Sequence, residues 1–221
     1  MHDYIDIYCE RTAAGLWDEP LNTLTNLAFV LAAALLARAY GQVYRGRLWQ
    51  GWDLVLLIAL IAAIGVGSGL WHLTAQSWAM WLDVLPILVF ISVFLLVSLR
   101  RALGLGWAAT LALFLLYHAV NTAVQRSLPP DTLNGSVFYL PTWAALALLS
   151  VWLARRQWPG WRAYAAANAL FLVSLSLRTI DAAVCGWLPI GTHFLWHLLN
   201  AWLLYLLVAA FFRPPAKLPA T

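Results

Sequence analysis

Apolar residues run through most of the chain in long stretches, separated by short segments rich in polar residues, glycine and proline. Seven of these stretches approach the roughly 20 residues that a helix needs to cross a bilayer. In hydrocarbon every backbone polar group must be paired within the protein, and a helix achieves this within one segment. The pattern therefore predicts an all-α, polytopic membrane protein with seven transmembrane helices. We expect the helices near residues 21–39, 52–73, 81–99, 106–124, 136–154, 162–184 and 192–212.

The composition favours the same class of protein. Apolar residues make up 63% of the chain and charged residues only 10%, whereas soluble domains carry roughly 25% charged residues. The 14 tryptophans suit a membrane protein, because tryptophan collects at the lipid headgroups. The net charge of +4 is small and forms no basic stripe, which argues against nucleic-acid binding.

Basic residues mark one side of the predicted membrane. Ten of the 13 lysines and arginines flank alternate connections or follow the last apolar stretch, and such residues concentrate in cytoplasmic loops. This predicts an outside N-terminus and a cytoplasmic C-terminus, with an acidic extracytoplasmic segment over 1–20, a membrane domain over 21–212 and a cytoplasmic tail over 213–221. The ten residues are Arg38, Arg45, Arg47, Arg100, Arg101, Arg155, Arg156, Arg162, Arg213 and Lys217.

Three histidines are predicted to share one depth near the outer face. His72 ends the second apolar stretch, while His193 and His197 lie one turn apart on one face of the last. A buried structural histidine would explain each of them separately. Ionisable groups within a membrane are nevertheless functional by default, and three protein ligands with an open position are typical of catalytic zinc. Such a histidine pair could also hold haem or copper, but a nearby carboxylate and hydroxyl suit zinc hydrolysis better.

Asp83 and Ser68 supply that carboxylate and hydroxyl. Asp83 could carry the proton of a metal-bound water, orient a histidine ligand, or cap the third helix. Ser68 could donate to an oxyanion, or be a small residue that allows close helix packing among neighbouring glycines. A Ser68–His72 nucleophile pair is a weaker interpretation, because a metal-bound imidazole cannot act as the base.

Acidic and amide residues surround the start of the first helix. Asp6, Glu10 and Glu19 are interpreted from their spacing as a solvated acidic face, with calcium as the alternative because that cation prefers oxygen ligands. Asn22 and Asn26 are expected to cap the helix and bond to its neighbours.

The remaining polar residues receive structural interpretations. Arg178 and Asp181 are three positions apart on one helix, and we expect an internal ion pair. Cys9 and Cys185 are preferred as two unrelated small residues, although a disulfide is possible because both are predicted near the same membrane face. His118 is expected to be a satisfied structural histidine.

The ordered set of motifs resembles the alkaline ceramidases over about residues 6–212. That family is one branch of a superfamily of seven-helix membrane hydrolases that includes adiponectin-receptor-type and Per1-type proteins. The matching motifs are Tyr8-Cys9-Glu10, Glu19-Pro20-Leu21-Asn22 with Asn26, Ser68 with His72, Asp83, Asp181 with Cys185, and His193 with His197.

The resemblance implies zinc-dependent hydrolysis of ceramide, with zinc on the three histidines, Ser68 as the oxyanion partner and Asp83 as the proton carrier. It also implies calcium held by the N-terminal segment. Ile7 and Arg11 depart from the family pattern there. Glu10 and Glu19 match the calcium pattern, and Asp6, one residue before the family's acid, is a further possible ligand. The supporting residues are Asn22, Asn26 and Asp181.

The sequence thus predicts an intramembrane amide hydrolase that releases a sphingoid base and a fatty acid. The short loops suggest a bacterial inner-membrane protein with its active site near the extracytoplasmic face. A lipid is the expected partner, without nucleic acid or an obligate protein partner. One alternative is a zinc hydrolase of another N-acyl or ester lipid. Another is a non-catalytic, receptor-like protein with structural zinc, in which Asp83 fills the fourth position.

Overall fold

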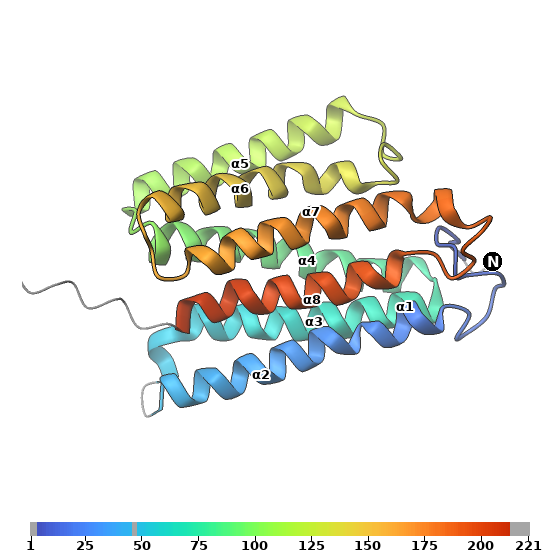
Figure 1. Cartoon of the computed structure of the whole chain (residues 1–221), viewed down its shortest axis with the longest axis horizontal. Coiled ribbons are helices and arrows are strands. Elements are labelled where there is room, and N and C mark those ends of the chain that lie inside the picture. The colour runs from blue at the N-terminus through green and yellow to red at the C-terminus, as the bar shows by residue number, and fades with distance from the viewer. Residues whose placement is uncertain (1–3, 46–47, 213–221) are drawn as a thin grey trace, which may run out of the picture.

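The structure, a computed structural model, describes residues 4–45 and 48–212. Its helices run roughly along one long axis and form a single bundle (Figure 1). Within these residues, seven helical units are long and apolar enough to cross a membrane, so the predicted all-α fold with seven spans is confirmed. The expected tail over 213–221 lies outside the described residues.

The first spanning unit consists of two helices that meet at Asn26, and each later unit is built on one long helix. Short 3-10 turns cover Leu48–Gly51, Ser136–Tyr139 and Ala210–Phe212, and a π-helical turn covers Ser98–Ala102. The α-helices are α1 (Pro20–Thr25), α2 (Leu27–Val43), α3 (Trp52–Thr74), α4 (Ser77–Val97), α5 (Trp107–Ser127), α6 (Leu140–Arg155), α7 (Trp161–Val184) and α8 (His193–Ala209).

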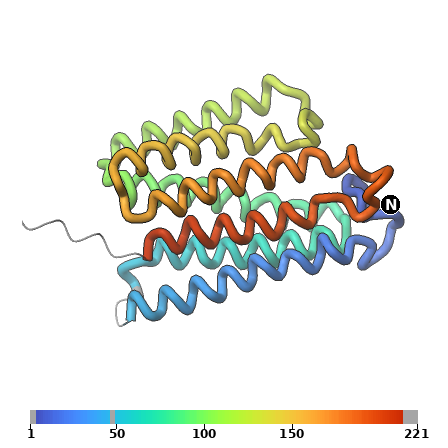
Figure 2. Tube along the Cα trace, viewed as in Figure 1, coloured from blue at the N-terminus to red at the C-terminus, as the bar shows by residue number. Residues whose placement is uncertain are grey.

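Helices α3 and α8 occupy the interior of the bundle. α3 packs against α2 and α4, and α8 packs against α2 and α7, so the first and the last long helices of the described chain lie side by side (Figure 2). Half of the residues in the most apolar stretch of the α3 span are buried inside the protein, against 6% of those in the α5 span. The two helices with the predicted histidines are therefore the ones most fully enclosed by the protein.

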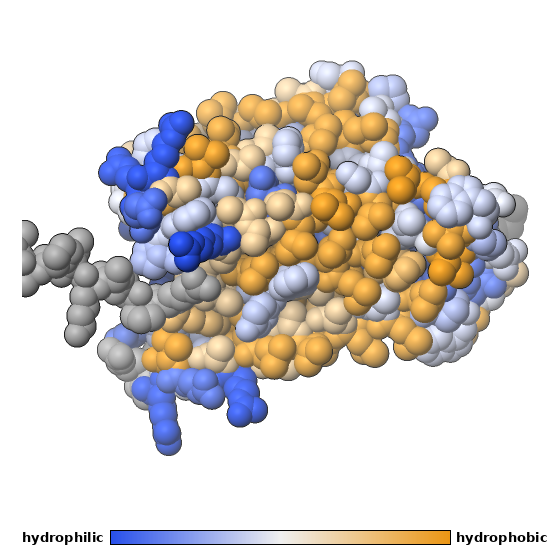
Figure 3. All heavy atoms as spheres, viewed as in Figure 1, coloured by the Kyte–Doolittle hydropathy of each residue, from blue (hydrophilic) through white to orange (hydrophobic). Residues whose placement is uncertain are grey.

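The surface has the pattern expected of a protein embedded in lipid. Apolar side chains cover the middle of the face shown in Figure 3, and hydrophilic side chains gather at its ends. Large apolar side chains such as Leu115 and Leu148 are 65% and 74% exposed on the helices. Exposed apolar surface on this scale is stable in hydrocarbon rather than in water, which supports an integral multi-pass membrane protein.

The fourth helix starts earlier than the sequence predicts. α4 begins at Ser77, not near residue 81, and only Ala75 and Gln76 connect it to α3. Ala75 adopts a left-handed conformation with φ of 50°, which allows this abrupt reversal. Asp83 consequently lies in the second turn of α4, so its expected alternative role as a helix cap is wrong.

Candidate metal centre

Three buried histidines converge at one end of the bundle. His72 comes from the last turn of α3, while His193 and His197 come from the first two turns of α8. One potential ligand atom from each ring lies within 4.8 Å of the others. This is the only such group of histidine, cysteine and acidic residues in the part of the chain that the structure describes.

The unpaired ring nitrogens of these histidines fit a metal site. His72 Nε2 and His193 Nδ1 are buried, and no described residue hydrogen-bonds to either atom. An unpaired polar atom in a protein interior is costly, and bonding to a metal ion would remove that cost. Imidazole nitrogens are common ligands of zinc, so the donor set suits that metal.

Two histidine rings are oriented from behind by residues at the start of the first spanning unit. Glu19 Oε2 lies 2.6 Å from His72 Nδ1, and Thr25 Oγ1 lies 2.9 Å from His197 Nδ1. Such contacts set the tautomer and direction of a metal-binding histidine. They leave Nε2 of His72 without a hydrogen-bond partner among the described residues. The sequence reasoning did not assign this role to Glu19 or Thr25.

Asp181 fixes the start of α8, and thereby His193. Its Oδ1 accepts hydrogen bonds from the backbone N–H groups of Thr192 at 2.6 Å and His193 at 2.9 Å. Gly191 allows this approach, because a Cβ atom there would lie 2.2 Å from Asp181 Oδ1. Its φ of +63° also favours glycine.

The expected ion pair between Arg178 and Asp181 is not formed. Arg178 instead donates to the Asn134 carbonyl at 2.6 Å and to Ser136 Oγ at 3.0 Å. Asp181 is already satisfied by the backbone N–H groups at the start of α8. The i,i+3 spacing permits a pair, but each group finds a partner in a different loop.

The N-terminal segment is fastened over the histidines. Cys9 and Cys185 form a disulfide, so the preferred interpretation of two unrelated cysteines is wrong. The neighbouring Tyr8 ring stacks on His193 with 4.0 Å between ring centroids and lies 4.9 Å from the ring of His72. Burial raises the pKa of the Tyr8 hydroxyl, so this side chain stays neutral. The disulfide thus holds an aromatic cover against two of the three histidines.

Ser68 and Asp83 face each other beside the histidines. Ser68 is one turn before His72 on α3 and is 3% exposed. Its hydroxyl is placed to donate a hydrogen bond to the Asp83 carboxylate. Asp83 is half-buried and does not belong to the group of three histidines that could hold a metal ion. The arrangement therefore places a hydroxyl and a carboxylate next to the possible metal without using either as a ligand.

Close packing of α3 against α4 creates this pair. Gly67 Cα lies so near α4 that an added Cβ would be 1.9 Å from the Leu82 carbonyl oxygen. Pro86 has no N–H to bond to that oxygen within α4. The absence of a side chain at Gly67 therefore lets Ser68 and Asp83 meet.

Gly67→Ala is expected to destabilise the protein, whereas Gly69→Ala is not. The first change forces α3 away from α4 and should lower the free energy of unfolding by about 1–3 kcal/mol, as overpacking does. The Cβ at position 69 would lie 3.8 Å from Asn26 Cβ, an ordinary contact. Thermal unfolding in detergent measures both, and equal stability of the two variants would contradict the packing argument.

The acids expected to hold calcium do not gather. Asp6 is exposed. Glu10 accepts the backbone N–H groups of Leu21 at 2.6 Å and Asn22 at 2.8 Å, and so begins α1. Burial raises the pKa of Glu10 although these two bonds oppose it. Glu19 is 2% exposed and binds His72 instead. This segment therefore offers no cluster of free carboxylates.

The other polar residues mainly support the local structure. Asn22 Nδ2 donates to Glu19 Oε2 at 2.9 Å, and Asn26 Nδ2 donates to the Asn22 carbonyl at 2.7 Å. Both asparagines are therefore bonded within their own segment rather than across to neighbouring helices. His118 Nε2 lies 3.4 Å from Ser92 Oγ, as expected of a structural histidine.

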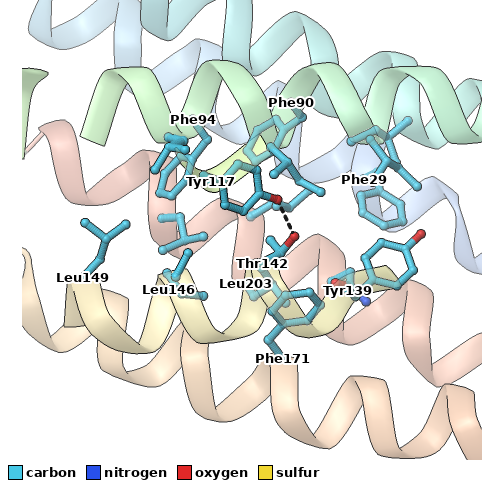
Figure 4. A pocket seen from close by; sticks show the side chains of 18 of the residues that line it. Phe29, Phe90, Phe94, Tyr117, Tyr139, Thr142, Leu146, Leu149, Phe171 and Leu203 are labelled. Atoms are coloured by element: carbon cyan, nitrogen blue, oxygen red, sulfur yellow. Dashed lines mark hydrogen bonds between the residues drawn. The ribbon is translucent and has the colours of Figure 1, made fainter. Parts of the chain in front are cut away.

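An apolar cavity lies between the helices of the bundle (Figure 4). Among its lining residues, Ile64 lies four positions before Ser68 and Ile87 four positions after Asp83. Residues four apart share a helix face, so the cavity continues the line of the polar pair into the bundle. Its lining along α8 extends from Trp196 to Leu207, about 16 Å at 1.5 Å per residue.

Comparison with protein-family models gives one match that covers almost the whole chain. The model described as Ceramidase matches residues 8–213. The match includes Ser68, Asp83 and the three histidines. Comparison with curated proteins finds no match.

Proposed function

Because this chain belongs to the Ceramidase family, we propose that it is a zinc-dependent hydrolase that cleaves ceramide within the membrane. The products would be a sphingoid base and a free fatty acid. The observation that carries the proposal is the buried group of His72, His193 and His197, whose ligand atoms lie within 4.8 Å of one another. Family membership supports a hydrolase, and the histidines supply the donors that a metal hydrolase needs.

Zinc would be held by the three histidines alone. When bound, it would lower the pKa of a coordinated water toward ~7 and polarise the substrate carbonyl. Three protein ligands are typical of catalytic zinc, whereas structural zinc usually has four. Asp83 lies outside the metal-binding group, which favours the catalytic interpretation over a receptor-like protein with structural zinc.

Asp83 and Ser68 would then perform the proton transfer and the stabilisation of charge. Asp83 accepts a proton from the attacking water as the water oxygen adds to the amide carbonyl. It returns that proton to the nitrogen of the departing amine, which leaves as a neutral group. Ser68 donates a hydrogen bond to the carbonyl oxygen as negative charge develops on it.

The apolar cavity suits the acyl chain of such a lipid. The hydrocarbon core of a bilayer is about 30 Å thick, so each leaflet contributes roughly 15 Å, close to the length of the lining along α8. Tyr117 and Thr142 bond to each other at 2.8 Å, which leaves the wall without unpaired hydroxyls at that point. An amide at the histidines would place its acyl chain in this cavity.

Ser68→Ala is expected to lower turnover by about 10²–10³-fold, the usual cost of removing one oxyanion donor. Zinc content should be unchanged, because Ser68 is not a ligand. Ser92→Ala is the matched control, since that hydroxyl bonds to the Leu88 carbonyl on α4 away from the site. Turnover measured at saturating lipid checks this, and a KM increase with unchanged kcat would contradict the assigned role.

The proposed substrate is tested with purified protein in lipid-containing micelles. Release of fatty acid is measured from ceramide, from other N-acyl lipids and from ester lipids, alongside zinc content by mass spectrometry. Ceramide turnover supports the proposal. Preference for another lipid would favour the alternative zinc hydrolase of an N-acyl or ester lipid. Bound zinc without turnover on any lipid would favour the receptor-like protein. Protein that never binds zinc would defeat all of these possibilities.

We propose an orientation and a location for the protein as well. The distribution of basic residues supports an outside N-terminus, a cytoplasmic C-terminus and an active site at the extracytoplasmic face, and the short loops suggest a bacterial inner membrane. A protease-cleavable tag is placed at each end of the chain, and its cleavage by protease added to intact cells tests this topology. The N-terminal tag should be cleaved and the C-terminal tag protected.

A further inference from the structure

Arg11 is a buried cation at the edge of the candidate metal centre. It is the only lysine or arginine among the first 20 residues, and its side chain is 0% exposed. A buried charge is stable only when it is paired and fully hydrogen-bonded. The partners of this guanidinium therefore show what it does for the surrounding segment.

The oxygen atoms around the Arg11 guanidinium belong to four different residues. Nε donates to Glu19 Oε1 at 2.5 Å, and one terminal nitrogen donates to the His72 carbonyl at 2.7 Å. The other terminal nitrogen donates to the carbonyls of Gly15 at 3.1 Å and Ala13 at 3.5 Å. A carboxylate and several backbone carbonyls are also the kind of oxygen ligands that calcium prefers.

Three carboxylates of this segment already accept hydrogen bonds from N–H donors, and Asp6 is exposed. Glu19 uses one oxygen for Arg11 and the other for His72 and Asn22. Glu10 bonds to the backbone at the start of α1. Asp18 accepts the backbone N–H groups of Thr12 and Ala13. A calcium ion would have to displace these donors and would also be repelled by the adjacent guanidinium, so the residues present do not fit calcium.

We propose that Arg11 is an internal replacement for a bound cation, so that the protein does not require calcium. The guanidinium gathers the carbonyls of the 12–18 loop and joins them to Glu19. It also acts on His72 at two points, through the backbone carbonyl directly and through the ring by way of Glu19. Arg11 is thus a positioning residue for the metal centre, although it touches neither the substrate nor the metal.

The first test measures calcium dependence directly. Thermal unfolding of the purified full chain is recorded in calcium chloride and in a calcium chelator that leaves the zinc occupancy unchanged. We expect the same midpoint in both conditions. A saturable increase in the midpoint with calcium, absent with magnesium, would overturn the proposal. This measurement does not depend on the substrate, so it stands apart from the proposed ceramide hydrolysis.

The second test concerns positioning, and it rests on the proposed zinc site. Zinc affinity is measured by competition with a chelating dye, well below the unfolding temperature. Arg11→Ala is expected to weaken zinc binding by about 10–100-fold, the usual effect of removing a group behind a metal ligand. Arg11→Lys should recover part of that loss, because it keeps the charge but not the planar fork.

Two controls separate positioning from general destabilisation. Leu153→Ala removes a side chain that is 1% exposed near the C-terminal end of α6. This change should lower the stability of the protein without changing its zinc affinity. Arg126→Ala removes an exposed arginine and should change neither. Unchanged zinc affinity in Arg11→Ala, or an equal loss in Leu153→Ala, would overturn the positioning role. If Arg11→Ala does not fold, Arg11→Lys provides the same comparison.

Discussion

The His193→Ala variant is expected to lose both bound zinc and measurable hydrolysis. His193 is the first residue of α8, and two separate contacts hold it in place: Asp181 at its backbone N–H and the stacked ring of Tyr8. Removing its ring leaves two imidazoles, too few for a stable zinc site. We expect turnover to fall on the order of 10⁴-fold or more, because without zinc the pKa of the attacking water would no longer be lowered.

The measurement combines zinc content with fatty-acid release at the same protein concentration. His118→Ala is the matched control, because this histidine on α5 contacts Ser92 and lies outside the group of three. It should retain both zinc and turnover. Full turnover by His193→Ala would contradict the proposed zinc mechanism. Complete loss of turnover in His118→Ala would show that the assay reports folding instead.

Asp83→Asn is expected to lower turnover by about 10²–10⁴-fold, the usual contribution of a general acid–base group, while zinc stays bound. Asparagine keeps the shape of the side chain and a hydrogen-bond acceptor for Ser68, but it cannot carry the proton. Zinc content should match the wild type, because Asp83 is not in the metal-binding group. Loss of zinc in Asp83→Asn would instead support a role as a ligand.

Substrates with different leaving groups distinguish a proton-transfer role of Asp83 from a purely positioning role. For a lipid analogue whose amine departs without needing a proton, Asp83→Asn should lose less turnover relative to the wild type than it loses for ceramide. If both substrates lose activity equally, Asp83 does not protonate the leaving nitrogen. Asp53→Asn is the control, since Asp53 pairs with Arg101 at the other end of α3 and should not affect turnover.

The features that the sequence predicts well are those encoded within single helices. A membrane span is visible in one stretch of chain, because hydrocarbon requires each segment to satisfy its own backbone. The pairing of His193 with His197 follows from helical spacing alone. The common depth of His72 and the α8 histidines follows from counting spans, and the structure brings these residues within reach of one metal ion.

The features that the sequence does not reveal depend on how the N-terminal segment docks. Ile5 donates to the Ala75 carbonyl at 3.0 Å, and Glu19 reaches His72 across 53 positions in the chain. No periodic pattern links such residues, and the expectation that Glu19 belongs to a solvated acidic face is wrong, because Glu19 is 2% exposed. Arg11 was visible only as a departure from a family pattern, and its burial could not be inferred from spacing.

The disulfide between Cys9 and Cys185 has a consequence for the compartment that the site faces. Such bonds persist in oxidising surroundings and are rare in reducing cytosol. The bonded cysteines lie at the end of the bundle that carries the histidines, since Tyr8 stacks on His193. We therefore expect the metal centre to face the oxidising side of the membrane. This expectation comes from redox chemistry, independently of the loop charges, and both lead to the same orientation.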